Sequence, residues 1–327
     1  MAAMAAGGLL LLSFAAFALE RKVETQEIRL LSTPGGRVVV PKYGYGLLAF
    51  RHMNEPGMPH FTVLDPIADR TVVKITAAAP EALETYPIAL AVFPDRRRFV
   101  VSAATKNYSK KRSLWLLFYD TEGNLTHHER ITPFNASLLA VAPDGAVWGL
   151  GCNEKTAEDK NSVEPVLYQW SENGRLLNKL LAQRDFMSAY GDLSGAPMPC
   201  PGDVVAGMGS SALAASRDRV VLFDAGSGIL AEISASGQVL GVYTPPRRQL
   251  PDGKPAPGRG LAVTGDGEIY AAFDSICRFD RATKTWAPVE DLPALAGRGM
   301  IFGGAGNQVL RSGESGDRFH FRLVTLK

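Results

Sequence analysis

The chain has 327 residues, of which 46% are hydrophobic and 21% are charged, and its net charge is +2. This length suits one large all-β domain or two ordinary domains. The net charge is small, and the sequence has no basic stripe with interleaved aromatic residues. Neither nucleic acid nor an anionic membrane is therefore expected as a partner. The 33 glycines and 21 prolines have no short period, which indicates many turns rather than long helices.

The N-terminal segment 1–18 predicts a signal peptide that is removed. Residues 7–18 are an uncharged apolar run, too short to span a bilayer comfortably, and the run ends on the small-x-small pattern Ala16-Phe17-Ala18. No Lys or Arg precedes it, so an apolar tail or a misassigned start codon stays open as an alternative. We expect a secreted or periplasmic protein with one domain over residues 19–327 and no stable membrane span after signal removal.

A strand–turn–strand sequence pattern recurs along the rest of the chain. It is most regular at Leu261–Tyr270, where two short apolar strands flank a Gly-Asp-Gly turn, and a third strand follows at 276–279. The same pattern begins again at Ile88, Leu138 and Leu213, and each copy is followed by a third and a fourth strand. Four short strands that repeat at intervals of about forty to fifty residues are typical of the blades of a β-propeller.

Counting the units from the N-terminus predicts six blades. The first blade takes strands at 38–41, 46–50, 60–64 and 71–75. The last unit supplies three strands, around 299–303, 308–311 and 319–325. The unused strand at 27–31 is expected to take the missing fourth place, because a blade with an unpaired edge is a liability. The predicted fold is therefore an all-β, six-bladed β-propeller whose last blade is closed by an N-terminal strand.

The segment Leu261–Tyr270 resembles the repeats of NHL and TolB-like six-bladed propellers, and the resemblance extends over about residues 27–327. It lies in turns and buried strand positions, so it implies a fold rather than a function. Some proteins of this shape are calcium-dependent lactonases or peptide-amidating lyases. This sequence has no acidic and amide ligand pattern that matches either of them residue by residue.

The connections between the strands differ in length from one face of the expected ring to the other. Turns between first and second strands, and between third and fourth strands, are short. The other connections are long and fall on the opposite face, the long-loop face: 51–59, 104–112, 152–164, 182–210 and 244–258. Long loops on one face indicate a binding surface there, with neutral loop growth as the alternative.

Three arginines occupy one equivalent position, directly before the first strand of a blade. They are Arg37, Arg259 and Arg298, and each follows a glycine. They belong to the adjacent blades one, five and six, so their guanidinium groups are expected at the channel mouth, where they would hold an anionic group. The alternative is that each arginine pairs with a local carboxylate.

The three cysteines match no zinc or redox spacing. Cys152 and Cys200 both fall on the long-loop face around the third blade, so we predict a disulfide between them and a free thiol at Cys277. His52 and His60 flank one long loop without a third ligand, and we interpret them as surface histidines rather than a metal site.

The sequence alone favours a noncatalytic exported module that binds a small anionic ligand or a protein through its long-loop face. No metal or cofactor motif is present, and no catalytic residue can be named. The alternative is a propeller hydrolase or lyase with a metal or arginine site at the channel mouth. Acidic or histidine side chains that converge at that mouth would distinguish the enzyme.

Overall fold

The structure is a computed structural model. It describes residues 23–31, 41–53, 57–107, 112–157, 159, 161–191, 212–224, 228–245, 258–273, 275–289, 300–313 and 319–326. These residues form β-strands and one short helix, α1 (Gln183–Phe186), which continues into the π-helical turn η1 (Met187–Gly191). No described helix is long and apolar enough to cross a membrane.

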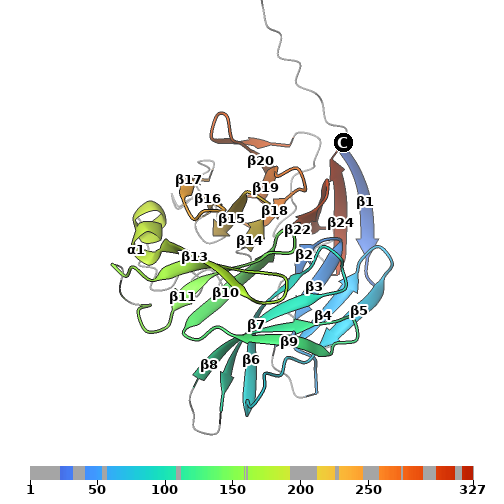
Figure 1. Cartoon of the computed structure of the whole chain (residues 1–327). Coiled ribbons are helices and arrows are strands. Elements are labelled where there is room, and N and C mark those ends of the chain that lie inside the picture. Colours follow the sequence, from blue (N-terminus) through green and yellow to red (C-terminus); the bar gives the residue numbers. More distant parts are fainter. Residues whose placement is uncertain are drawn as a thin grey trace, which may run out of the picture.

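The strands group into four-stranded antiparallel units in chain order (Figure 1). Unit 1 holds β2 (Lys42–Gly44), β3 (Leu47–Arg51), β4 (Phe61–Asp65) and β5 (Arg70–Ile75). Unit 2 holds β6 (Glu84–Val92), β7 (Phe99–Lys106), β8 (Arg112–Tyr119) and β9 (Leu125–Arg130). Unit 3 holds β10 (Phe134–Val141), β11 (Val147–Asn153), β12 (Pro165–Trp170) and β13 (Leu176–Ala182).

The second half of the chain repeats this plan. Unit 4 holds β14 (Ala212–Ala215), β15 (Arg219–Asp224), β16 (Ile229–Ser234) and β17 (Val239–Tyr243). Unit 5 holds β18 (Leu261–Val263), β19 (Ile269–Ala272), β20 (Ile276–Asp280) and β21 (Thr285–Pro288). Unit 6 holds β22 (Ile301–Ala305), β23 (Gln308–Ser312) and β24 (His320–Leu326), and its outer strand is β1 (Val23–Arg29).

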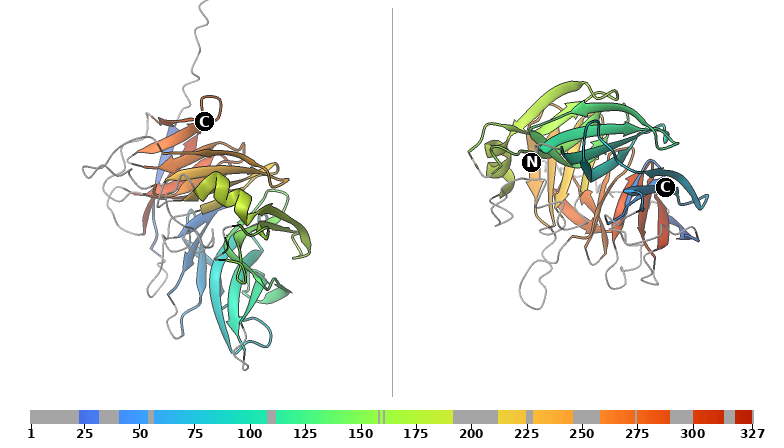
Figure 2. Two further views of the ribbon diagram at one scale, coloured as in Figure 1. Left: turned by 90° about the vertical axis from the view of Figure 1, so that its left-hand side faces the viewer. Right: turned by 90° about the horizontal axis from the view of Figure 1, so that it is seen from below.

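The N-terminal strand does pair with the last strand of the chain. β1 lies antiparallel to β24 along its whole length (Figures 1 and 2). Ile28 lies opposite Phe321 in this pairing. Ile28 and Leu30 are buried, and Glu27 forms an ion pair with Arg322 and has a carboxylate oxygen 2.7 Å from His320 Nε2. Residues 24–27 are exposed, so the apolar contact of this segment with the last unit is made at its C-terminal end, by Ile28 in the strand and by Leu30 directly after it.

The predicted six separate blades differ from the observed sheets. Within the described residues, units 6 and 1 merge into one eight-stranded sheet through parallel pairing of β22 with β2. Tyr43 lies opposite Gly303 and Gly44 opposite Gly304. A Cβ on Gly303 would lie 2.0 Å from the Tyr43 carbonyl oxygen, so only glycine permits this approach of the two backbones.

The first strand of unit 1 also begins later than predicted. It is β2, directly before a two-residue turn in which Tyr45 and Gly46 both have positive φ. Such a turn connects adjacent hairpin strands tightly, so β2 must end at Gly44. The predicted strand 38–41 falls largely outside the described residues.

The hydrophobic core lies between consecutive units rather than inside one. Separate clusters of buried residues join units 1 and 2, 2 and 3, 3 and 4, 4 and 5, 5 and 6, and 6 and 1. The middle strands are covered on both faces, which explains continuous apolar runs such as Phe99–Val101. This all-β stacking of four-stranded sheets is consistent with a β-propeller.

Candidate functional site

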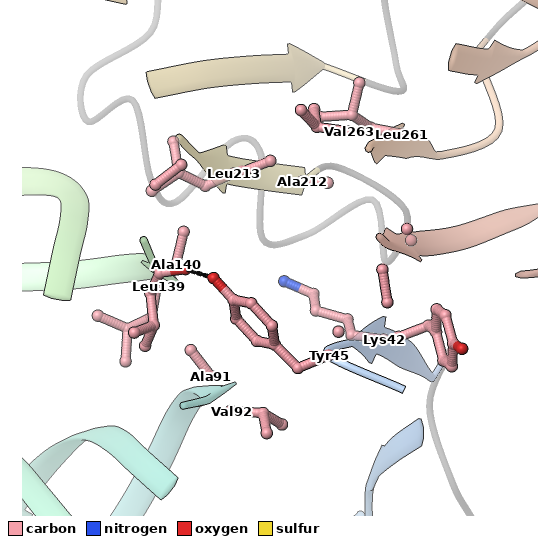
Figure 3. Close-up of a pocket in the computed structure, with 18 of the residues that line it drawn as sticks. Lys42, Tyr45, Ala91, Val92, Leu139, Ala140, Ala212, Leu213, Leu261 and Val263 are labelled. Atoms are coloured by element: carbon pink, nitrogen blue, oxygen red, sulfur yellow. Dashed lines mark hydrogen bonds between the residues drawn. The ribbon is translucent and has the colours of Figure 1, made fainter. Parts of the chain in front are cut away.

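The first strands of all six units surround one cavity. Its walls come from β2, β6, β10, β14, β18 and β22 and from the short turns that follow them, and its volume is about 170 Å³. The walls are mostly small or apolar, with Ala91, Leu139, Ala212, Leu213 and Val263 among them (Figure 3). Small side chains on the innermost strands leave space where the strands converge.

The hydroxyl groups of Ser216 and Thr264 also line this cavity, but both are occupied within their own turns. Ser216 donates to Asp218 at 2.8 Å, and Thr264 donates to Asp266. Neither hydroxyl is therefore a ready partner for a ligand. The described lining contains no carboxylate.

Lys42 is the single charged side chain among the residues that line the cavity. It projects from β2 into the space between the strands, with its nitrogen near the ring of Tyr45 (Figure 3). No hydrogen bond or ion pair joins its amine to any described residue. An ammonium group in an apolar enclosure without a counter-charge is electrostatically unfavourable.

The surroundings of Lys42 favour its neutral form. Burial lowers the pKa of the Lys42 amine from 10.5 to about 8, and the positive charge of Arg51 contributes in the same direction. Arg51 ends β3 and donates to the Ile88 carbonyl at 3.0 Å, which holds its guanidinium group in place. At neutral pH the amine is still mostly protonated, but a substantial neutral fraction is present.

Tyr45 forms the wall beside Lys42. The left-handed backbone of the Tyr45-Gly46 turn projects this side chain into the cavity, and its hydroxyl donates to the Val141 carbonyl at 2.8 Å. Burial raises the pKa of this hydroxyl to about 12, and Asp144 adds to the shift. The phenol is therefore a fixed neutral wall that joins units 1 and 3.

The predicted arginine site is only partly within the described residues, because Arg37 and Arg298 lie outside them. Arg259 is described, and its backbone joins two units: its N–H donates to Ala272 at 2.7 Å and its carbonyl accepts from Ile301 at 2.9 Å. A Cβ on Gly258 would lie 2.2 Å from the Phe223 ring, and one on Gly260 would lie 1.9 Å from the Ile301 carbonyl oxygen. The close contacts with Phe223 and Ile301 therefore explain the glycines at both positions without any role in ligand binding.

Two of the three cysteines, Cys152 and Cys277, lie within the described residues. Cys152 is disulfide-bonded, whereas Cys200 lies outside the described residues. Cys277 is a buried thiol whose sulfur lies 3.6 Å from the Ser275 hydroxyl. The pairing of Cys152 with Cys200 stays a prediction.

The interpretation of His52 as a surface histidine is wrong, and His60 is only partly exposed. His52 is 3% exposed and its Nε2 lies 2.8 Å from the Thr62 hydroxyl. His60 is partly buried, and its Nδ1 accepts the Ala77 N–H at 2.8 Å. Both rings satisfy polar groups at strand ends, a role that depends on strand pairing and has no sequence signature. Among the described residues, no group of three or more His, Cys, Asp or Glu side chains is arranged to hold a metal ion.

Sequence reasoning overlooked Lys42 and Tyr45. The signal that could have identified them is the Tyr45-Gly46 hairpin turn, since it makes 42–44 the innermost strand of unit 1. A lysine on an innermost strand is unusual, because the equivalent positions of other units carry small or apolar side chains. Of the long loops that were expected to form the site, 182–210 and 244–258 lie mostly outside the described residues, whereas 51–59, 104–112 and 152–164 lie mostly within them.

No protein-family model and no curated protein matches the sequence. Solved structures that are similar include virginiamycin B lyase from Staphylococcus aureus, at 10% identity and a TM-score of 0.48, covering 94% of this chain and 100% of that one. The calcium-binding protein regucalcin from Agrobacterium tumefaciens has 16% identity and a TM-score of 0.49, with 92% and 95% covered. A luciferin-regenerating enzyme has 14% identity and a TM-score of 0.47, with 93% and 97% covered. At these identities and TM-scores, the similarities do not assign a function to this chain.

Proposed function

We propose that this protein binds a small, mainly apolar molecule with one anionic head group in its central cavity. The observation that carries the proposal is the unpaired amine of Lys42 inside apolar walls. A carboxylate placed beside this amine would supply the missing counter-charge, and its apolar body would contact Leu139, Leu213 and Val263.

The size of the cavity limits the ligand. An apolar cavity of about 150 Å³ in another protein binds benzene, and the cavity described above has a volume of about 170 Å³. A single aromatic or branched aliphatic body with a carboxylate is therefore the matching chemistry. The shape of the ligand would be selected by the rigid inner strands, and its charge by Lys42.

The proposal includes a closed ring of six blades of the NHL or TolB-like kind. It is supported by the six hydrophobic clusters, which link the units in a cycle that returns from unit 6 to unit 1, and by the pairing of β1 with β24. Export is also part of the proposal. It is supported by the apolar run at 7–18 and by the disulfide bond at Cys152, since disulfides persist in oxidising compartments.

The experiment is a calorimetric titration of the full chain with benzoate at pH 7. We expect saturable binding that Lys42→Met weakens at least about tenfold, the effect of losing one charge-assisted contact. Lys74→Met is the matched control, because Lys74 is exposed on the outer strand of the same unit. Benzamide, which has the same ring without the charge, should respond to Lys42→Met by less than about twofold. Equal benzoate affinity in the native chain and in Lys42→Met, or no binding to the native chain, would contradict the proposal.

A further inference from the structure

The geometry around Lys42 fits a reactive amine as well as a binding charge. No described carboxylate pairs with its nitrogen, the walls that surround it are apolar, and the neighbouring Tyr45 hydroxyl already donates to Val141. A lysine that is desolvated in an apolar pocket or placed beside another cation is a more available nucleophile than an exposed lysine. Lys42 meets both conditions, because Arg51 repels its charge.

We infer that Lys42 captures small aldehydes as an imine inside the central cavity. This inference rests on the proposed function in one respect: the cavity must admit a small molecule. It names a second ligand class for the same site, one in which the contact with Lys42 is a covalent bond rather than an ion pair.

The reaction is a condensation that needs no oxidant or reductant. The lone pair of the neutral Nζ attacks the aldehyde carbon, and the C=O pair moves to oxygen, which takes up a proton. The nitrogen gives up a proton in turn, so a carbinolamine results. Its hydroxyl takes up a further proton and leaves as water while the nitrogen lone pair forms the C=N bond. The resulting iminium nitrogen then releases its remaining proton to water, which gives the imine. Amine and aldehyde are thus converted into imine and water, and no group is oxidised.

The other titratable groups near Lys42 do not compete for the aldehyde. Arg51 carries a guanidinium group, which stays protonated in proteins. The hydroxyls of Tyr43 and Tyr45 have pKa values raised to about 12, chiefly by burial, so they stay neutral over the range in which the Lys42 amine titrates. The amine, with its pKa lowered to about 8 by burial and by Arg51, is therefore the group that becomes nucleophilic near neutral pH.

Reductive trapping tests the inference. The full chain is treated with benzaldehyde and sodium cyanoborohydride at pH 8, and the modified lysines are found by peptide mass mapping. We expect one benzyl group on Lys42, introduced at least about tenfold faster than on exposed lysines such as Lys74, because a far larger fraction of the Lys42 amine is neutral at this pH. Lys42→Met should lose the fast phase, whereas Tyr45→Phe should keep it.

A parallel titration with benzoate separates this inference from the proposed function. If benzoate binds and slows the labelling of Lys42, both stand. If Lys42 is labelled fast while benzoate neither binds nor protects, the inference stands and the anion-binding function is wrong. If benzoate binds but Lys42 is labelled no faster than Lys74, only the inference is overturned. If neither occurs, the cavity does not admit small molecules and both are overturned.

Discussion

At the scale of single residues, the molecule keeps a cation, Lys42, among apolar cavity walls. Lys42 lies on an innermost strand, and burial lowers the pKa of its amine to about 8. Replacement of a poorly paired buried charge by an apolar side chain of similar volume is frequently neutral or stabilising. A group retained at a cost in stability is more readily explained by function than by folding.

We expect Lys42→Met to increase the free energy of unfolding by an amount that depends on pH. The unfolded chain holds the Lys42 proton up to its ordinary pKa of 10.5, whereas the folded chain releases it near pH 8. The cost of the buried charge is therefore complete below pH 8, decreases as pH rises, and disappears above 10.5. We expect the variant to be more stable by about 1–3 kcal/mol at pH 7, with the lower end favoured because the side chain still partly faces the cavity.

Urea denaturation of the native chain and of Lys42→Met at pH 7 and at pH 10.5 measures this difference. The two curves should converge at the higher pH, and Lys74→Met should show no such convergence. A variant that is less stable than the native chain at pH 7, or a difference that does not change with pH, would show that the buried charge carries no such cost.

At the scale of elements, ion pairs at the short turns connect one unit to the next. Arg96 pairs with Asp65 of the preceding unit at 2.8 Å, and Arg98 pairs with Glu172 of the following unit at 2.9 Å. The basic segment 96–98 thus joins units 1, 2 and 3. The Arg98–Glu172 pair is exposed on both sides, so it is expected to contribute little to stability. In the other pair, the Asp65 side chain is only 12% exposed.

A buried carboxylate, that of Glu232, connects units 4 and 5 through ion pairs. Glu232 lies on β16 with its side chain 3% exposed, and it accepts from Arg219 at 3.2 Å and from Arg281 of unit 5 at 2.8 Å. We expect Glu232→Gln to destabilise the fold by about 1–3 kcal/mol, because both guanidinium groups lose their shared counter-charge while the shape is kept.

The matched control for Glu232 is Asp218→Asn. Asp218 pairs with the same Arg219, but its side chain is 65% exposed. We expect this control to change the free energy of unfolding by less than about 0.5 kcal/mol. Chemical denaturation of both variants distinguishes the two positions, and equal effects would mean that burial of Glu232 adds nothing to the connection between units 4 and 5.

At the scale of the whole molecule, the two ends of the described chain meet in one unit. β1 completes the sheet of β22, β23 and β24, so residues near the start and the end of the sequence depend on each other for folding (Figure 2). Ile28 of β1 and Leu30, which directly follows the strand, enter the cluster that joins units 6 and 1. This strand therefore contributes both to a sheet and to the contact between neighbouring units.

Deletion of residues 19–32 should consequently be severely destabilising, because it exposes the edge of β24 and opens the cluster between units 6 and 1. A graded version is Ile28→Ala, for which we expect a loss of about 2–4 kcal/mol in the free energy of unfolding. Thr25→Ala, at an exposed position of the same strand, should change it by less than about 0.5 kcal/mol. Urea denaturation provides the measurement, and an Ile28→Ala effect as small as that of Thr25→Ala would exclude a closing role for β1.

The sequence by itself determined the all-β class, the four-strand repeat and the pairing of the N-terminal strand with the last strand. These features depend on local periodicity and on counting: short apolar runs, Gly-Asp turns and a final unit with a strand missing. Only the tertiary structure decided the remainder. The merging of units 6 and 1 depends on Gly303 meeting Tyr43 across the chain, and the cavity around Lys42 depends on six first strands converging. Such contacts join residues that are distant in sequence, so no local pattern records them, and the charge of Lys42 becomes unusual only where those strands exclude water.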